Sequence, residues 1–153
     1  SAHMHIICGD LRQAHAQIAP GTFDYVLSNP PYYPPKSGYL HAQDSLCAAR
    51  SEICCPFDAL CAAAARALRW GGRVFLVHKP ERLVDLMTGL RAARLEPKRI
   101  RFVRHRAETA VNLVLIESRL GGGPGLQYEP DLFLYEQTGE LSAEGRRIYH
   151  LQE

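Results

Sequence analysis

The stretch Asp24-Tyr25-Val26-Leu27-Ser28-Asn29-Pro30-Pro31-Tyr32 decides the fold. Its apolar first half predicts a buried strand, and the two prolines end that strand because proline has no backbone N–H to donate to a neighbouring strand. Asn29 precedes a proline and is therefore restricted to extended geometry. A carboxamide, several backbone carbonyls and an aromatic ring thus leave one rigid turn. Because ligands bind at the carboxyl edge of an open α/β sheet, we expect this turn to hold a planar ring that carries an amino group.

The rest of the chain alternates between strand-like and helix-like segments. Apolar runs predict strands over residues 5–8, 73–78, 97–104 and 110–118, in addition to 23–28, and a short strand-like piece at 132–135. Helical patterns occur at 11–18, 56–68 and 81–94, with single helical turns at 45–50 and 143–149. Pro56 and Pro80 stand at the start of two of these helices, and Gly71 and Gly72 predict a glycine cap after helix 56–68. Residues 30–44, with four prolines and three tyrosines, predict a long loop.

This order of elements indicates the fold class. Strands that alternate with helices are typical of a parallel, doubly wound sheet. The short turn at 106–109 joins the last two long strands, and a connection of that length requires them to be antiparallel. We therefore expect an α/β protein with a Rossmann-like sheet and an antiparallel last strand.

Length and composition indicate one soluble domain. The chain has 153 residues, of which 46% are hydrophobic and 22% charged, an ordinary globular balance. The net charge of +2 does not by itself indicate nucleic acid, although ten of the 18 Lys and Arg residues fall between Arg66 and Arg101. No apolar run approaches the length of a membrane span. An odd number of cysteines, five, without a Cys-x-x-Cys pair predicts reduced thiols and a cytoplasmic location.

The cysteines and histidines do not predict a metal site. Cys54, Cys55 and Cys61 lack the spacing of zinc ligands. His78 and His105 lie at the ends of predicted strands without a second ligand at a suitable distance in the sequence. We therefore expect structural or RNA-facing histidines, packed cysteines and no metal.

Several short motifs occur in an order that resembles one enzyme family. These motifs are Gly9-Asp10-Leu11, Asn29-Pro30-Pro31-Tyr32, Ala49-Arg50-Ser51-Glu52, Gly71-Gly72-Arg73, His78-Lys79-Pro80-Glu81-Arg82, the basic strand 98–101, Leu134-Tyr135-Glu136 and Gly139-Glu140-Leu141-Ser142. The Asn-Pro-Pro-Tyr element is similar to that of class I S-adenosylmethionine-dependent methyltransferases that modify amino groups. The full set resembles the bacterial tRNA adenine N6-methyltransferases that act beside the anticodon of valine tRNA.

The resemblance implies roles for the residues of the opening stretch. The side-chain oxygen of Asn29 and the carbonyl of Pro30 would each accept one N6–H bond of a target adenine. Pro31 completes the rigid turn, and Tyr32 would stack on the flipped base, a contact worth on the order of 1–3 kcal/mol. The alternative is that the prolines only punctuate the strand and that Asn29 is a turn residue.

The resemblance also implies S-adenosyl-L-methionine as cofactor. Asp10 would accept a hydrogen bond from the adenine amine of the cofactor, Leu11 would cover its ring, and Asn29 would face it as well. The alternative for Asp10 is a helix N-cap, and for Leu11 a place in the core.

A tRNA substrate would need cations to bind its phosphates. The candidates are Lys36, Arg50, Lys79, Arg82 and Arg101. The alternative is an ordinary solvated surface, with Arg50 paired to Glu52 in a surface salt bridge. Other possible substrates of such a site are a protein glutamine side chain and a ribosomal RNA or DNA base.

The motifs also predict that the chain is one part of the complete fold. A glycine-rich loop and an acidic residue that would hold the cofactor are not found before Asp10. We expect residues 1–4 to be a cloning remnant, 5–119 a partial methyltransferase domain from its third strand onward, and 120–153 a tail packed on it. Cofactor binding would then be weak or absent, and strand 23–28 would form a bare sheet edge that invites self-association or a displaced N-terminal segment. A catalytically silent fragment that only binds RNA or self-associates is the alternative function.

Overall fold

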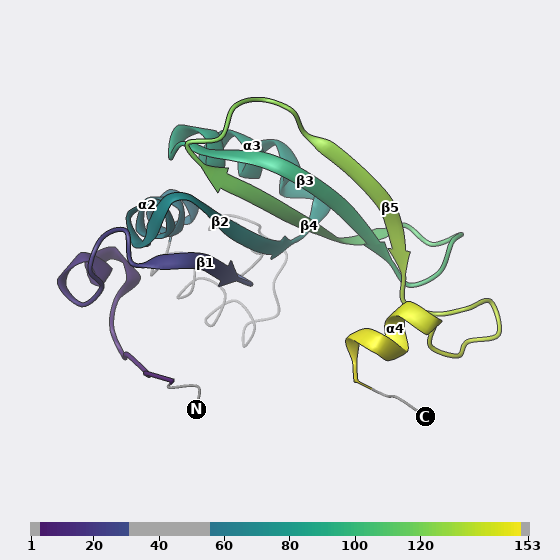
Figure 1. The fold of residues 1–153 in the computed structure, drawn as a ribbon. Helices are drawn as coiled ribbons and strands as arrows, with labels where there is room; N and C mark the ends of the chain where they lie inside the picture. Colours follow the sequence, from purple (N-terminus) through teal and green to yellow (C-terminus); the bar gives the residue numbers. More distant parts are fainter. Residues whose placement is uncertain (1–3, 31–55, 151–153) are drawn as a thin grey trace, which may run out of the picture.

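The computed structural model describes residues 4–30 and 56–150, without the side chains of 14–16. Residues 31–55, which include Pro31, Tyr32, Lys36, Arg50 and the predicted turn at 45–50, lie outside the described part. Five strands form one sheet (Figure 1). They are β1 (Phe23–Ser28), β2 (Leu68–His78), β3 (Leu95–Arg104), β4 (Val111–Leu120) and β5 (Gln127–Phe133), in the spatial order β1-β2-β4-β3-β5.

The strand directions confirm the predicted mixed sheet. β1 is parallel to β2, and β3 is parallel to β5, whereas β4 is antiparallel to both of its neighbours, β2 and β3. The turn between β3 and β4 is closed by the backbone N–H of Thr109, which donates to the carbonyl of Arg106 at 3.2 Å. The Thr109 hydroxyl also donates to that carbonyl, at 2.8 Å. This tight turn is the local reason for the antiparallel pair.

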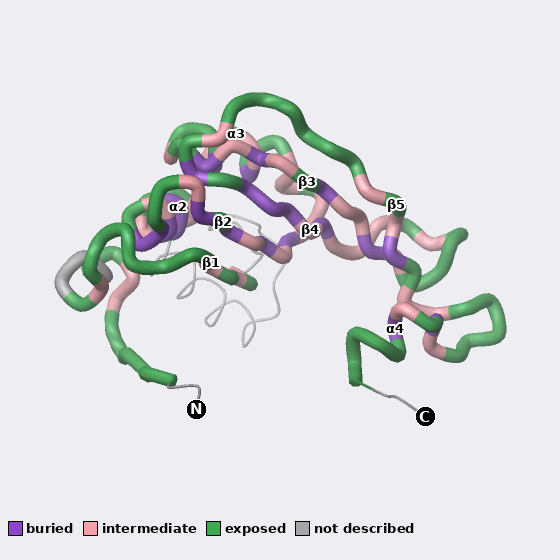
Figure 2. Tube along the Cα trace, viewed as in Figure 1, coloured by how far each residue is buried: buried purple, intermediate pink, exposed green. Residues whose placement is uncertain are grey.

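Two helices cover one face of the sheet. Figure 1 shows α2 (Phe57–Ala67) and α3 (Leu83–Ala92) on the same side of the strands. Their buried side chains, such as Leu60 and Leu86, form one core with alternate residues of the strands, such as Val74 and Ile116. Figure 2 shows this burial in the central strands and in the helices, while β1 is largely exposed. None of the described helices is long and apolar enough to span a membrane.

The opposite face, which we call the open face, is the side of the sheet away from α2 and α3. Successive side chains of a strand point to opposite faces. Val74 and Leu76 point into the core, so Phe75 and Val77 between them point to the open face, where both are only half-buried. The open face positions the candidate site described below.

The N-terminal strand predicted at 5–8 does not form. These residues have no regular secondary structure, and Ile6 is 86% exposed. A strand is stable only when its backbone groups are paired with a neighbour, and within the described part of the chain no strand pairs with this segment. The helix predicted at 11–18 is a shorter 3₁₀ helix, η1 (Leu11–Ala16).

The predicted glycine cap after helix 56–68 is also wrong. α2 ends at Ala67, and Leu68 is already extended, with φ −73° and ψ 140°. The glycines instead lie in β2, where the register against β1 shifts between the pairs Phe23↔Leu68 and Tyr25↔Arg73. Gly71 takes a φ of +79° in this bulge, a conformation that favours glycine.

The elements that follow β2 differ from the prediction in part. β5 begins at Gln127, five residues before the predicted strand-like piece, and pairs with β3 along its length. The helix predicted at 81–94 is divided into a 3₁₀ turn, η2 (Pro80–Arg82), and α3. The predicted helical turn at 143–149 is confirmed as α4 (Ala143–Ile148).

Candidate active site

β1 delivers Asn29 to the carboxyl edge of the sheet, as predicted. Ser28 pairs with Leu76 of β2, so that Asn29 comes directly after the last ladder position of β1. Asn29 is exposed and Pro30 is half-buried. The two acceptors that the sequence predicts for a target amine, the Asn29 carboxamide and the Pro30 carbonyl, therefore leave the sheet together.

Asn29 also lines an open cavity of about 540 Å³. The cavity extends from the end of β1 across β2 and β4 to β3 and Glu129 of β5. Its lining includes apolar side chains, such as Phe75 and Leu115, and two arginines, Arg99 and Arg101. An open, partly apolar cavity next to two hydrogen-bond acceptors has the character of a site for a planar polar ring.

The end of β2 lies at the same edge of the sheet and carries a buried histidine. His78 is 5% exposed, and its Nδ1 accepts a 2.8 Å hydrogen bond from the backbone N–H of Lys79. Burial lowers the pKa of His78 and outweighs the backbone contact with Lys79, which acts in the opposite direction. A neutral imidazole that accepts at Nδ1 carries its proton on Nε2, and it stabilises the turn that begins at Lys79.

Lys79 is held beside the start of β4. Its Nζ lies 3.4 Å from both the carbonyl oxygen and the side-chain Oδ1 of Asn112. Asn112 reaches this edge because β4 is antiparallel, so that its first residues lie beside the last residues of β2. The sequence analysis missed Asn112, although a polar residue at the start of an otherwise apolar antiparallel strand is a usable signal.

The predicted cofactor residues lie on a different element from Asn29. Asp10 precedes η1 and accepts hydrogen bonds from Arg12, from its backbone N–H at 2.9 Å and from its Nε at 3.0 Å. The Arg12 guanidinium lowers the pKa of Asp10. Leu11 lines a second cavity, beside η1 and α2, and packs against the core, whereas Asn29 lines the cavity on the open face.

Asp10 and Leu11 therefore fit S-adenosyl-L-methionine only in part. A cofactor amine would compete with Arg12 for the Asp10 carboxylate. That pair is exposed, and an exposed ion pair is easily displaced. The cofactor assignments of Asp10, Leu11 and Asn29 thus stay predictions.

Of the predicted phosphate-binding cations, the structure describes Lys79, Arg82 and Arg101. Their partners differ. Arg101 donates to both carboxylate oxygens of Glu144, at 2.7 and 2.8 Å, and to the carbonyl of Pro130. Arg82 donates from Nε to Asp85 at 2.7 Å. Because Arg101 is bound in a two-pronged ion pair, it is available to phosphate only if Glu144 is displaced. The contacts of Lys79 to Asn112 are longer and involve no carboxylate.

A row of charges crosses the open face beside the cavity. The buried carboxylate of Glu117 on β4 accepts from Arg73 on β2 and from Arg99 on β3, each at 2.9 Å. Arg99 also pairs with Glu129 on β5. The sequence analysis missed Glu117, because its two partners lie 44 and 18 residues away and only the sheet brings them together. The charges in this row balance one another, so the row does not form a phosphate site.

Within residues 4–30 and 56–150, no group of three His, Cys, Asp or Glu side chains could hold a metal ion. Cys61 is buried in α2 and Cys8 is exposed. Burial raises the pKa of Cys61 to about 12, so this thiol is unreactive and has a packing role.

Comparison with known proteins supports the fold. The sequence matches no protein-family model and no curated protein. A structure described as a predicted O-methyltransferase from Agrobacterium tumefaciens has a TM-score of 0.70 and 16% identity, over 90% of this chain and 56% of that chain. A structure described as a putative DNA modification methylase from Thermus thermophilus, complexed with S-adenosyl-L-methionine, has a TM-score of 0.53 and 17% identity, over 91% of this chain and 56% of that chain.

These similarities concern the arrangement of the chain in space. The chain spans little more than half the length of the structures that it matches. The similarities to these structures do not single out the valine-tRNA family, which remains a hypothesis. The five-stranded sheet and its helices have the α/β fold found in these methyltransferase structures.

Proposed function

We propose that the chain is the target-base part of an S-adenosylmethionine-dependent methyltransferase that modifies the N6 amino group of an adenine in the anticodon region of a tRNA. One observation carries the proposal. Asn29 and Pro30 follow the parallel strand β1 at the carboxyl edge of a sheet with a methyltransferase-like fold. Ligands of open α/β sheets bind at that edge, and the motif there supplies two acceptors and no general base.

The chemistry requires those acceptors. The adenine amine is a poor nucleophile because its lone pair is delocalised into the ring. The side-chain oxygen of Asn29 and the carbonyl of Pro30 would hold the two N6–H groups and direct the nitrogen lone pair at the methyl donor. This is orientation and electrostatic preorganisation. With the cofactor bound, N6 would take the methyl group as the S–C bond of the donor breaks, and the proton that N6 loses would pass to solvent water.

The cofactor, when bound, supplies the methyl group from its sulfonium. Asp10 and Leu11 would contribute to its adenine site if Arg12 gave up the Asp10 carboxylate. We propose that this chain alone binds S-adenosyl-L-methionine weakly or not at all. The part of the neighbouring structures that this chain does not span would then carry most of the cofactor site.

For the tRNA, we propose Lys79, Arg82, Lys36 and Arg50 as phosphate contacts. Among the described cations, Lys79 is the best candidate for this role, because it lies at the same edge of the sheet as Asn29. Arg101 is the weakest candidate, because Glu144 neutralises it. A base that leaves its loop loses a few kcal/mol of stacking, which contacts in the site would have to offset.

The experiment is a methylation assay at millimolar S-adenosyl-L-methionine with bulk tRNA, followed by digestion and mass spectrometry. Because the chain alone binds the cofactor weakly, we expect only a low yield of N6-methyladenosine, and Asn29→Ala should reduce that yield by a further factor of roughly 10² or more, the loss typical when one preorganised polar partner is removed. The matched control is Gln127→Ala, an exposed residue at the start of β5, which should leave the product unchanged.

A parallel reaction with a release factor tests the main substrate alternative. Methylglutamine in that protein, without methyladenosine in tRNA, would replace the nucleic-acid substrate with a protein one. One observation favours a second function, a silent RNA-binding chain: the Asp10 carboxylate is already occupied by Arg12. Binding of tRNA without cofactor binding or methyl transfer would support that function instead.

A further inference from the structure

β1 forms an unprotected edge of the sheet. In the described part of the chain it pairs with β2 alone and stands first in the strand order. Its large apolar side chains are exposed, Phe23 by 45%, Tyr25 by 61% and Leu27 by 77%. Edge strands are usually protected by lysine, proline or a bulge that turns them away. β1 contains no lysine or proline, and its charged residue, Asp24, is paired with Arg69.

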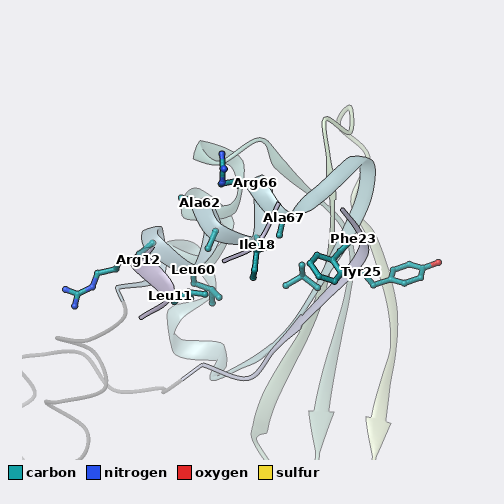
Figure 3. Close-up of a pocket in the computed structure, with 13 residues that line it drawn as sticks. Leu11, Arg12, Ile18, Phe23, Tyr25, Leu60, Ala62, Arg66 and Ala67 are labelled. Atoms are coloured by element: carbon teal, nitrogen blue, oxygen red, sulfur yellow. The ribbon is translucent and has the colours of Figure 1, made fainter. Parts of the chain in front are cut away.

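An apolar cavity of about 540 Å³ lies beside this edge. Figure 3 shows it between η1, β1 and α2, with Leu11, Ile18, Phe23 and Leu60 around it. The alanine-rich side of α2 forms much of its wall, so there are few large side chains to fill it. Protein interiors are close-packed, and an open cavity of this character indicates that further apolar side chains belong in it.

The N-terminal segment is apolar and pairs with no strand in residues 4–30 and 56–150. We call residues 5–8 the arm. Ile6 is 86% and Ile7 54% exposed, and Figure 1 shows the arm leaving η1 and running away from β1. Its sequence predicts a strand, and about 3.3 Å per residue makes it roughly 13 Å long when extended, within the roughly 20 Å of the six-residue β1.

We propose that two copies of this chain associate by exchanging arms, so that the arm of each copy pairs with the β1 edge of the other and one of its two isoleucines, Ile6 or Ile7, reaches the apolar cavity. The arm and the β1 edge are complementary. Among its described residues, each copy has a strand-forming segment outside the sheet and an open edge beside an unfilled cavity, and reciprocal exchange satisfies both at once. Such a contact is self-complementary and closes under two-fold symmetry.

The available area supports a second copy as the occupant. The exposed parts of Ile6, Ile7, Phe23, Tyr25 and Leu27 amount to on the order of 600 Å² per copy, if a large apolar side chain buries roughly 200 Å². A stable interface needs about 800 Å² per partner. The cavity wall and the strand backbones supply the remainder. Simple pairing of the two β1 edges would leave both the cavities and the arms uncovered.

The first test is the oligomeric state of the chain by sedimentation equilibrium at micromolar concentrations. We expect a dimer. Leu27→Lys on the edge and Ile6→Asp on the arm should each raise the dimer dissociation constant by roughly 30-fold or more, as expected for a central interface side chain. Both residues are exposed in the monomer, so circular dichroism should show an unchanged fold. The matched control is Val84→Asp, at a position 78% exposed on α3, which should leave the dimer intact.

A monomeric wild-type chain would overturn the proposal, and so would a dimer that both variants leave unchanged. The second test is a disulfide across the proposed contact. Tyr25→Cys places a thiol on β1 to react with the exposed Cys8 that ends the arm. We expect an oxidised dimer band that disappears when Cys8→Ser is added. A band that is independent of Cys8, or a monomer with an internal disulfide, would show that arms are not exchanged.

Discussion

His78 combines burial with a polar contact that depends on its charge. The ring is buried against the edge of Phe57, with ring centroids 6.4 Å apart. Its Nδ1 must stay unprotonated to accept from the backbone of Lys79. At the residue scale, the turn after β2 therefore depends on a neutral imidazole.

This dependence predicts how stability changes with pH. Burial lowers the folded-state pKa of His78 below its ordinary value of 6.5, so the unfolded chain takes up a proton at higher pH than the folded chain does. The contribution of His78 is complete above pH 6.5 and is lost as pH falls through the folded pKa. Denaturant unfolding at about pH 7, 6 and 5 should show a decrease in stability, and His78→Asn should flatten it.

The matched comparison for this prediction is His78→Ala. An asparagine oxygen can replace Nδ1 as acceptor, whereas alanine leaves the Lys79 N–H unpaired, which costs about 1–3 kcal/mol for a buried group. At neutral pH, the asparagine variant should thus be the more stable of the two. An unchanged pH slope in both variants would contradict the assignment to His78.

At the element scale, α4 is attached to the sheet by a few specific contacts. The Ser142 hydroxyl donates to the Phe133 carbonyl at 2.7 Å and accepts from the Gly145 N–H at 2.9 Å, which caps the helix. Arg101 of β3 then holds Glu144 with two hydrogen bonds. This ion pair lowers the pKa of Glu144 and raises that of Arg101. A helix of six residues is not stable alone, so these contacts determine whether it forms.

A double-mutant cycle on Arg101 and Glu144 measures this attachment. We expect a coupling free energy on the order of 1 kcal/mol, because the pair is two-pronged and partly buried. The coupling should decrease at high salt. Arg101→Lys should lose most of it, because an ammonium cannot bind both oxygens in this geometry. Additive effects, together with a loss of tRNA affinity in Arg101→Ala, would restore the RNA-binding role first predicted for Arg101.

A second contact at this scale lies beside the bulge in β2. The indole of Trp70 lies so close to Gly121 that a Cβ there would overlap the ring. Arg94 stacks on the same ring, 5.1 Å from its centroid. Gly121 also has a φ of +68°, which favours glycine. Segments that are distant in sequence thus meet at one tryptophan beside the bulge.

At the scale of the whole molecule, the core lies on one side of the sheet. The most buried side chains belong to α2, α3 and the facing residues of the strands. The open face carries a charge row and half-buried apolar residues instead. Stability should therefore depend on the helix-covered face far more than on the open one.

Paired substitutions in α3 test this distribution. Leu86, 2% exposed, faces the sheet, and Leu86→Ala should lower the free energy of unfolding by about 2–5 kcal/mol through lost burial and the cavity it leaves. Val84→Ala, two residues earlier on the exposed side, should change it by about 0.5 kcal/mol or less. Similar losses in both variants would mean that α3 does not pack as described.

Much of the fold could be predicted because its signals are local. The apolar run of β1, the prolines at the starts of α2 and η2, and the tight turn between β3 and β4 each act within a few residues. Asn29 was predictable for the same reason, since the strand and the proline that position it are its neighbours. The resemblance to methyltransferases added the direction of the chemistry, and the fold is consistent with it.

The sequence by itself determined most of the strands and helices and that Asn29 ends a strand, because backbone sterics and apolar periodicity operate over a few residues. Only the tertiary structure decided that Arg101 belongs to Glu144, that Gly71 and Gly72 form a bulge, and that the arm lies outside the sheet. Each of these outcomes depends on which partners compete for a group, and most of those partners are brought together by strand order, not by sequence distance.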